Sequence, residues 1–110
     1  MAESIKKNDD FKTVYRSGKS YANKYLVMYI LKNGMEKNRL GISVSKKVGN
    51  SVVRHRIARL LRESFRLNDE KFHSGWDIVV VARMNAKGKN YSEIESAFLH
   101  LAKLHGIRCL

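Results

Sequence analysis

The most informative side chains of this 110-residue sequence are the cations of residues 45–66, SKKVGNSVVRHRIARLLRESFR. The segment holds seven Lys and Arg against one acid, Glu63. Inside its helical part the cation is Arg five times and never Lys. A guanidinium group offers a rigid fork of donors that matches two phosphate oxygens at once. The segment therefore predicts a phosphate-binding surface, which would position a backbone without selecting a sequence.

Helical geometry gathers three of the five arginines on one side, together with His55. At about 100° per residue, His55, Arg59, Arg62 and Arg66 fall within roughly 60° of arc. The predicted opposite side is Val53, Ile57, Leu60, Leu61 and Ser64. A solvated face usually alternates acids with bases at i, i+4, and here that pairing is missing, which favours a polyanionic ligand. Arg54 and Arg56 flank the stripe, and Lys46, Lys47 and Asn50 precede the helix N-terminus, whose backbone donors also attract phosphate.

Composition points to the same kind of partner. The net charge is +12 and the isoelectric point is about 10.1, values typical of proteins that bind polyanions. Apolar residues make up 44% of the chain, which disfavours wholesale disorder. No apolar run approaches the ~20 residues that span a bilayer, and the start carries acids without an apolar core. We expect a cytoplasmic protein with one domain, residues 1–110.

Aromatic residues suggest a second surface. Phe11 and Tyr15 share a predicted helix face and could lie against Tyr25, Val27 and Tyr29 of a predicted strand. Cations lie nearby in the sequence at Lys12, Arg16 and Lys24. Aromatic rings bordered by cations suit single-stranded nucleic acid, whose bases stack and whose phosphates are neutralised. An ordinary core is the alternative, above all for Phe11.

The sequence contains no recognisable catalytic constellation. Its four His residues and its carboxylates are scattered, and it has no phosphate-cradling Gly-rich loop. His105 and Cys109 are four residues apart without a third ligand, so no metal site is expected. The single Cys also excludes an internal disulfide. Any reaction is expected to be supplied by another molecule.

The first half of the chain predicts a helix and two strands. Asn8 can cap a helix over residues 8–17, and Gly18 can end it. Residues 25–31 and 39–44 are apolar and rich in β-branched or aromatic side chains, as in strands. The Asn33-Gly34 turn signal between them predicts an antiparallel hairpin.

The second half predicts two helices around one buried strand. Asn50 or Ser51 can cap a helix that ends near Phe65, and residues 77–83 form an apolar run typical of a strand buried on both faces in a βαβ unit. A last helix opens at Ser92, with Glu95 completing a capping box. Its expected core stripe is Ile94, Ala97, Phe98, Leu101 and Leu104. These segments, in the order α-β-β-α-β-α, imply one mixed sheet in a two-layer sandwich.

One stretch resembles a known family. Lys46-Lys47-Val48-Gly49-Asn50 followed by Arg54-His55-Arg56 is similar to the Lys-Lys-x-Gly-Asn loop and Arg-Asn-Arg motif of the bacterial ribonuclease P protein subunit. His55 departs from the family Asn, whose amide offers a paired donor and acceptor that imidazole lacks. Further similar positions are residues 5–11, Ala22-Asn23, residues 40–45, and Ala82-Arg83 with Ala86.

The resemblance implies a fold and an activity. The implied fold is α+β, a two-layer sandwich of one mixed four-stranded sheet and about three helices in the order α-β-β-β-α-β-α. Its βαβ crossover is left-handed, as in the second domain of ribosomal protein S5. The implied function is the non-catalytic protein subunit of an endoribonuclease that removes the 5′ leader of precursor tRNA. The catalytic RNA would carry out the hydrolysis with Mg²⁺ that it mainly holds itself. No further protein partner is implied.

The resemblance also implies two sets of binding residues. Those for the catalytic RNA are Lys46, Lys47, Asn50, Arg54, His55, Arg56, Arg59, Arg62 and Arg66. Those for the single-stranded leader of precursor tRNA are Phe11, Tyr15, Asn23, Val27 and Tyr29. No residue is assigned a catalytic or metal-binding role.

Physical reasoning from the residues leaves other partners open. A ribosomal or other architectural RNA-binding protein would need the same basic helix. Binding in the major groove of DNA is weaker as a hypothesis, because the stripe lacks the Asn or Gln base readers common in such helices. Membrane binding is weaker still, because the apolar side of the helix is better used against the sheet.

Overall fold

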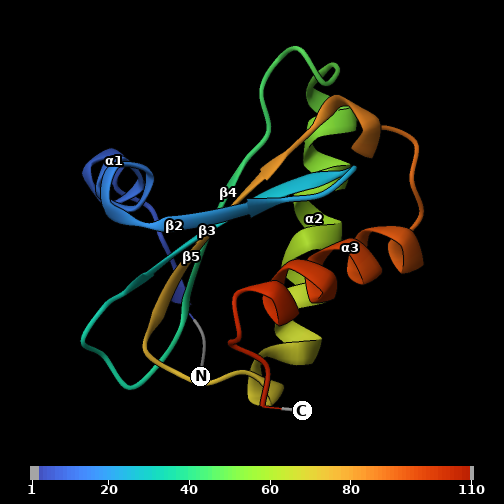
Figure 1. Ribbon diagram of the computed structural model, residues 1–110. Helices are drawn as coiled ribbons and strands as arrows, with labels where there is room; N and C mark the ends of the chain where they lie inside the picture. The colour runs from blue at the N-terminus through green and yellow to red at the C-terminus, as the bar shows by residue number, and fades with distance from the viewer. Residues whose placement is uncertain (1–2, 110) are drawn as a thin grey trace.

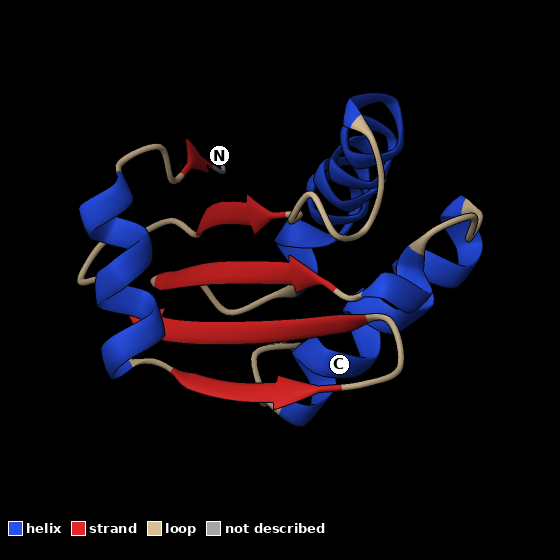
Figure 2. Cartoon of the chain, turned by 90° about the horizontal axis from the view of Figure 1, so that it is seen from above, coloured by secondary structure: helices blue, strands red, loops and turns tan. Residues whose placement is uncertain are grey.

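A single mixed sheet separates one helix from two others in the computed structural model, which describes residues 3–109 (Figures 1 and 2). The helices are α1 (Asn8–Ser17), α2 (Ser51–Asn68) and α3 (Tyr91–Leu104), with short 3₁₀ turns at Asp69–Lys71 and Met84–Ala86. The strands are β1 (Glu3–Ser4), β2 (Lys19–Ala22), β3 (Leu26–Lys32), β4 (Arg39–Ser43) and β5 (Trp76–Ala82). Helices α2 and α3 form the second layer of the predicted sandwich, while α1 covers part of the opposite face.

The strand order corrects the predicted pairing. The order is β1-β4-β5-β3-β2, so β5 lies between β3 and β4, and the predicted β3–β4 hairpin is wrong. The loop after β3 opens to admit β5: the Asn33 backbone N–H donates to Gly75 O at 2.9 Å, and the Asn38 side chain accepts from Trp76 N at 2.9 Å. Strand β4 is parallel to β5, which confirms the βαβ unit, and β3 is antiparallel to β5. The sheet has five strands instead of four because β1 adds a two-residue pairing to Arg39 and Leu40.

Both faces of the sheet are covered, as the apolar runs predicted. Ile78, Val79 and Val80 of β5 are completely buried. Alternate residues of β3 divide between two cores: Leu26, Met28 and Ile30 pack with α2 and α3, and Tyr29 and Leu31 pack under α1. The sheet therefore fixes α1 and α2 on opposite sides of the same three central strands.

Several helix ends differ from the sequence expectation. Helix α1 has the predicted bounds, but Lys7 is its N-cap residue and Asn8 is already helical. Gly18 follows its last residue in an extended conformation, at a position where a Cβ would lie 2.5 Å from Val14 O. Helix α3 begins two residues early, with Asn90 and Glu93 forming the capping box. Glu95 instead accepts hydrogen bonds from Tyr91 and Asn68.

The packing of α2 and α3 explains two more differences. Helix α2 extends beyond Phe65 to Asn68, whose buried side chain donates to Ser64 O and Glu95. Of the expected α3 stripe, Leu104 is 44% exposed, while its other members are buried. Among the described residues, no helix has both the length and the apolarity needed to cross a membrane.

Candidate nucleic-acid interface

The outer face of α2 carries the predicted stripe of cations. His55, Arg56, Arg59, Arg62 and Arg66 are exposed, and Arg54 is partly buried. Arg66 is the one stripe residue with an ion pair among residues 3–109, at 2.5 Å from Glu63, and this bond lowers the pKa of the Glu63 carboxyl. The other guanidinium groups of the stripe meet no carboxylate in the described part of the chain. Because Arg56, Arg59 and Arg62 are exposed, their charge is available to an external polyanion.

Local structure holds this face in place. The Asn50 side chain caps α2 by accepting from Val53 N at 3.0 Å. Buried Val48 anchors the loop before α2, so Lys46 and Lys47 are exposed beside the helix N-terminus. Arg56 donates to Lys89 O at 2.8 Å, which ties one end of the stripe to the loop before α3. Backbone donors, the helix dipole and two lysines thus meet at the start of α2.

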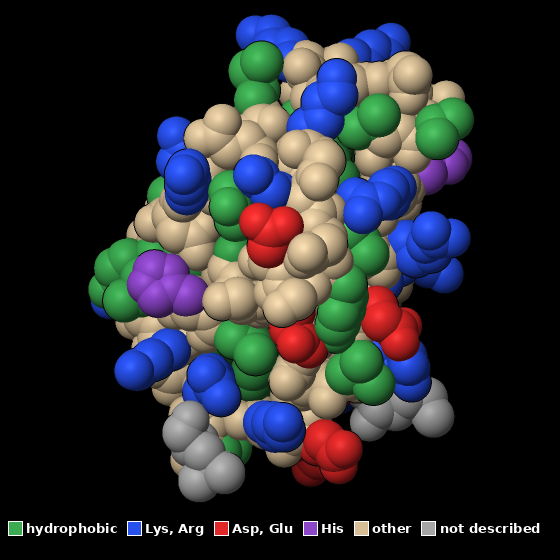
Figure 3. Space-filling model, turned by 90° about the vertical axis from the view of Figure 1, so that its right-hand side faces the viewer, with side chains coloured by type: hydrophobic (Ala, Val, Ile, Leu, Met, Phe, Trp, Pro, Cys, Tyr) green, Lys and Arg blue, Asp and Glu red, His purple; other side chains and the backbone are tan. Residues whose placement is uncertain are grey.

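The outer face of α2 contains a surface depression, and the surface visible near the start of α2 in Figure 3 carries no Asp or Glu side chains. A surface depression of about 660 Å³ is lined by Val52, His55, Arg56, Ala58, Arg59 and Arg62. In the upper part of Figure 3, where the start of α2 and the loop before it lie, Lys and Arg side chains are visible without Asp or Glu. Such a surface suits the rounded, regularly charged backbone of a folded nucleic acid.

A second surface lies between α1 and the sheet. The Tyr15 and Tyr29 rings meet edge to face with centroids 5.0 Å apart, and Phe11 is 6.4 Å from Tyr15. Val27 lies on the same face of β3 as Tyr29 by strand alternation. The adjoining groove, of about 430 Å³, is lined by Asn8, Phe11, Lys12, Tyr15, Ile42 and Ser43. Below, this set is called the aromatic groove.

Sequence reasoning missed the β4 wall of the aromatic groove. Ile42 and Ser43 lie in the predicted strand of residues 39–44, but the predicted β3–β4 hairpin would have placed them elsewhere. Gly41 supports the groove, because a Cβ there would lie 2.8 Å from the Phe11 ring. A glycine in the middle of an apolar strand was the available signal, since it often marks the close approach of another group.

Asn23 does not share the aromatic groove with the other predicted leader residues. Its side-chain oxygen accepts from the backbone N–H groups of Tyr25 and Leu26, at 3.2 and 3.0 Å. Its amide nitrogen donates to Ala97 O of α3 at 2.9 Å. Because α3 lies on the opposite side of the sheet from α1, the Asn23 side chain closes the β2–β3 turn there.

The histidines and the cysteine do not assemble into a metal cluster. Within residues 3–109, no group of three or more His, Cys, Asp or Glu side chains is placed to hold an ion. Cys109 Sγ lies 3.7 Å from His73 Nδ1. His105 packs against Tyr21 and hydrogen bonds with Met28 O at 2.8 Å, and burial lowers its pKa.

The fold and these surfaces define a nucleic-acid-binding α+β domain with an arginine-rich helix on one side and an aromatic groove on the other. The Ribonuclease P family model matches residues 1–105. The chain belongs to the ribonuclease P protein family. It is 69% identical to the ribonuclease P protein component of Lachnoclostridium phytofermentans, over 97% of this chain and 92% of the relative.

Solved structures of relatives have the same fold. The RNase P protein of Staphylococcus aureus superposes with a TM-score of 0.90 at 39% identity, covering 98% of this chain and 99% of that one. The RNase P protein of Thermotoga maritima gives a TM-score of 0.86 at 34% identity, covering 93% and 96% of the two chains. The predicted α+β class is confirmed.

Membership decides the biochemical role. The chain is the protein component of a ribonucleoprotein endoribonuclease that processes precursor tRNA, and RNA binding is its role there. An RNA subunit is thus its partner, and tRNA is the substrate of the assembly. The function predicted from the resemblance is confirmed over the architectural, DNA-binding and membrane-binding alternatives.

Proposed function

We propose that the outer face of α2 and the loop before it bind the catalytic RNA. The residues are Lys46, Lys47, Asn50, Arg54, His55, Arg56, Arg59 and Arg62, with Arg66 contributing less because Glu63 already engages it. The observation that supports this most is the row formed by Arg56, Arg59 and Arg62, which meet no carboxylate among residues 3–109, in a protein of net charge +12. Each Arg can hold two phosphate oxygens and lower the repulsion between RNA strands.

The aromatic groove is proposed to hold the single-stranded 5′ leader of precursor tRNA. Tyr15 is 37% exposed, so one ring face can accept a base, while Phe11 and Tyr29 support it. Lys12 at the groove wall can neutralise a phosphate of the same strand. Val27 belongs to the floor of this face, and Asn23 is left out because its hydrogen bonds hold it at α3.

In this arrangement the protein supplies binding and the RNA subunit supplies the reaction. Mg²⁺ held mainly by the RNA would activate the water that cleaves the phosphodiester bond. The residues of this chain orient the leader and screen phosphate charge, so that less Mg²⁺ is needed for the two RNAs to meet. We infer that the single domain works in the cytoplasm and requires no further protein.

Cleavage of precursor tRNA by the cognate RNA at low Mg²⁺, with and without the protein, tests the division of labour. The protein should restore cleavage there and should cut nothing when the RNA is omitted. Cleavage by the protein alone would overturn the proposal.

Tyr15 tests the leader assignment separately. Y15L should weaken binding of precursor tRNA by about 5- to 150-fold, because stacking on one base contributes about 1–3 kcal/mol. Affinity for mature tRNA, which lacks the leader, should not change. Y15F is the matched control, because it keeps the ring and should bind like the wild type. An equal loss for precursor and mature tRNA would contradict the leader groove.

A further inference from the structure

Two carboxylates lie at the start of α1, beside the groove proposed to hold RNA. Asp9 is exposed and Asp10 is partly buried. Their neighbours Asn8 and Phe11 line the aromatic groove. Negative charge in the first turn stabilises a helix, but it repels the phosphates of a strand bound nearby. In the described part of the chain Asp9 has no ion pair, whereas Asp10 has one, with Arg39 of β4.

Arg39 is fixed by the sheet before it meets α1. Its Nε donates to Asp77 Oδ1 at 2.8 Å and its Nη2 to Asp77 Oδ2 at 2.5 Å. Asp77 is 6% exposed, and it also accepts from the Asn33 side chain at 3.0 Å. The third nitrogen of the guanidinium group, Nη1, lies 3.5 Å from Asp10 Oδ2. Because the group is planar, its two bonds to Asp77 determine the direction in which Nη1 points.

The contact with Asp10 gains from this arrangement. An ion pair at a surface usually contributes little, because two side chains lose rotamer freedom to form it. Arg39 has already lost that freedom to Asp77, and Asp10 has only a short side chain to order. The Arg39 and Asp10 side chains are 22% and 37% exposed, so water screens the pair only in part. The contact can therefore hold the first turn of α1 against β4.

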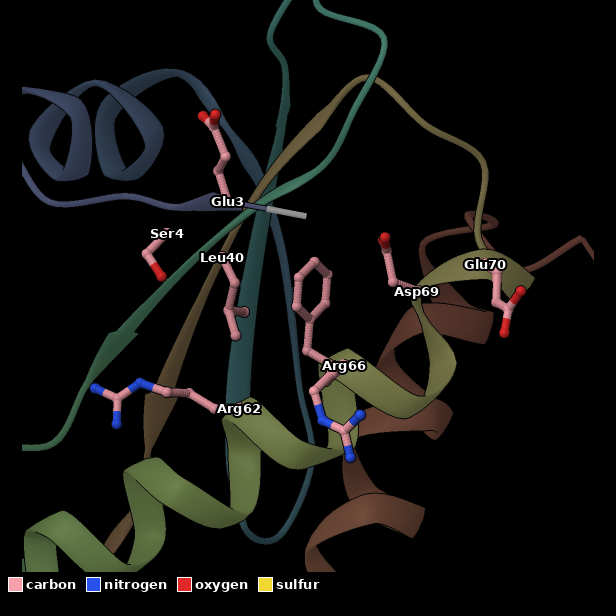
Figure 4. Close-up of a pocket in the computed structure, with 8 residues that line it drawn as sticks. Glu3, Ser4, Leu40, Arg62, Arg66, Asp69 and Glu70 are labelled. Atoms are coloured by element: carbon pink, nitrogen blue, oxygen red, sulfur yellow. The ribbon is translucent and has the colours of Figure 1, made fainter. Parts of the chain in front are cut away.

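Strand β4 meets α1 at a second point on the same face. Arg39 and Gly41 are two residues apart in the strand, so both face α1. A Cβ at Gly41 would lie 2.8 Å from the Phe11 ring, which shows how closely that ring approaches the strand. Leu40, between them, points the other way, toward α2 (Figure 4). Two adjacent residues of α1, Asp10 and Phe11, are thus seated on β4.

These contacts set one wall of the aromatic groove relative to the other. Helix α1 lies across the strands and carries Phe11, while the facing wall, Ile42 and Ser43, belongs to β4 (Figure 2). Val14 is 1% exposed and anchors the middle of α1 on the sheet. Without the contact to Arg39 the helix therefore stays in place, but its first turn can move away from β4 and change the width of the groove.

We propose that Arg39 is a positioning residue for leader binding. Through Asp10 it holds the first turn of α1 at the distance from β4 at which a single strand fits between Phe11 and Ile42. Only the fraction of molecules with the groove at that width binds the leader, so the contact raises the apparent affinity. This inference rests on the proposed function, because it requires the leader to occupy the aromatic groove.

Removing Asp10 tests this role, because charge and position predict opposite results. D10A removes a negative charge beside the groove, which by electrostatics alone should strengthen RNA binding. We expect the Kd of precursor tRNA for the assembled holoenzyme to rise instead, by about 2- to 5-fold, as for the loss of one partly exposed ion pair. The Kd of mature tRNA should not change. Cleavage at saturating precursor should not change either, because the RNA subunit supplies the reaction.

Two further variants separate position from charge. D9A removes the same charge from the same turn of α1 without breaking an ion pair in the described residues, so its precursor affinity should equal or exceed that of the wild type. D10E keeps the carboxylate and should restore the wild-type Kd. Thermal unfolding of all three variants, measured in parallel, shows that each is folded.

The outcomes also separate this inference from the proposed function. If Y15L loses leader-dependent affinity while D10A binds precursor as D9A does, the aromatic groove stands and the role of Arg39 is refuted. If D10A binds precursor more tightly than D9A, the freed Arg39 contacts the strand itself, which overturns the positioning role. An equal loss for precursor and mature tRNA, or a loss that D10E does not restore, would overturn it as well. If Y15L shows no loss, the leader groove fails first and this inference fails with it.

Discussion

Replacing Arg59 and Arg62 together tests the phosphate-binding face of α2 most directly. Both side chains are exposed, and neither has an ion pair within residues 3–109. Alanine is the best helix former, so R59A/R62A should not destabilise α2. We expect the unfolding free energy to change by no more than about 0.5 kcal/mol, as for most surface substitutions. RNA binding should change much more.

The size of the binding effect follows from the number of free cations. Lys46, Lys47, Arg54, Arg56, Arg59 and Arg62 have no ion pair in the described residues. If each neutralises one phosphate, log K should fall against log salt with a slope of about −4 to −5. Removing two of the six contacts should reduce the slope to about −3 to −3.6. Between 50 and 200 mM salt, the wild type should then lose about 300- to 2,000-fold in affinity and the variant about 50- to 150-fold.

The assay is equilibrium binding of the cognate catalytic RNA over that salt range, with thermal unfolding measured in parallel. K71A/K103A is the control, because it removes the same charge from exposed positions away from the α2 face. Its slope should match the wild type. Parallel salt lines for wild type and R59A/R62A would refute the phosphate contacts, and a large drop in Tm would show that the two arginines are structural.

Three further changes test the fold around the site. N50A removes the side-chain oxygen that accepts from Val53 N at the start of α2. The loss of this cap should cost about 1 kcal/mol of stability and lower Tm by about 4–8 °C in a thermal melt. An unchanged Tm would show that the cap does not stabilise the protein. G18A places a Cβ 2.5 Å from Val14 O, so its urea midpoint should fall by the equivalent of about 1–3 kcal/mol, and a higher midpoint would contradict the close approach. Burial lowers the pKa of His105 in the folded state, so the unfolded chain binds the proton more readily. The contribution of His105 to stability is therefore complete above the pKa of the unfolded chain, about 6.5, and is lost as pH falls through the lower pKa of the folded state. Thermal melts at pH 5 and pH 8 should show a smaller loss of stability at low pH in H105Q than in the wild type.

Local patterns were sufficient for the three helices, for strands β3, β4 and β5, and for the basic face, but they did not indicate β1 or β2. The 3.6-residue periodicity of residues 51–65 separated Arg59 and Arg62 from Ile57 and Leu61 without knowledge of any partner segment. The apolar run of residues 78–80 identified a strand buried on both sides. These features depend on side chains a few residues apart, whose relative directions are set by backbone geometry alone.

Capping shows where local signals compete. Ser92 with Glu95 and Asn90 with Glu93 have the same spacing, and both are acceptable capping pairs. Asn90 is the N-cap residue of α3 because Glu95 already accepts hydrogen bonds from Tyr91 and Asn68. Asn68 belongs to a different helix, α2. A contact between helices far apart in the sequence thus decided a local boundary.

The sequence by itself determined the helix of arginines, the charge and the family, because these reside in composition and short-range spacing. Only the tertiary structure decided that β5 separates β3 from β4, that Asn23 turns toward α3, and that Ile42 of β4 lines the aromatic groove. The physical reason is that strand neighbours are chosen by the burial of whole faces and by loop contacts such as that of Asn38 with Trp76. Those energies arise between residues distant in the chain, so no window of the sequence contains them.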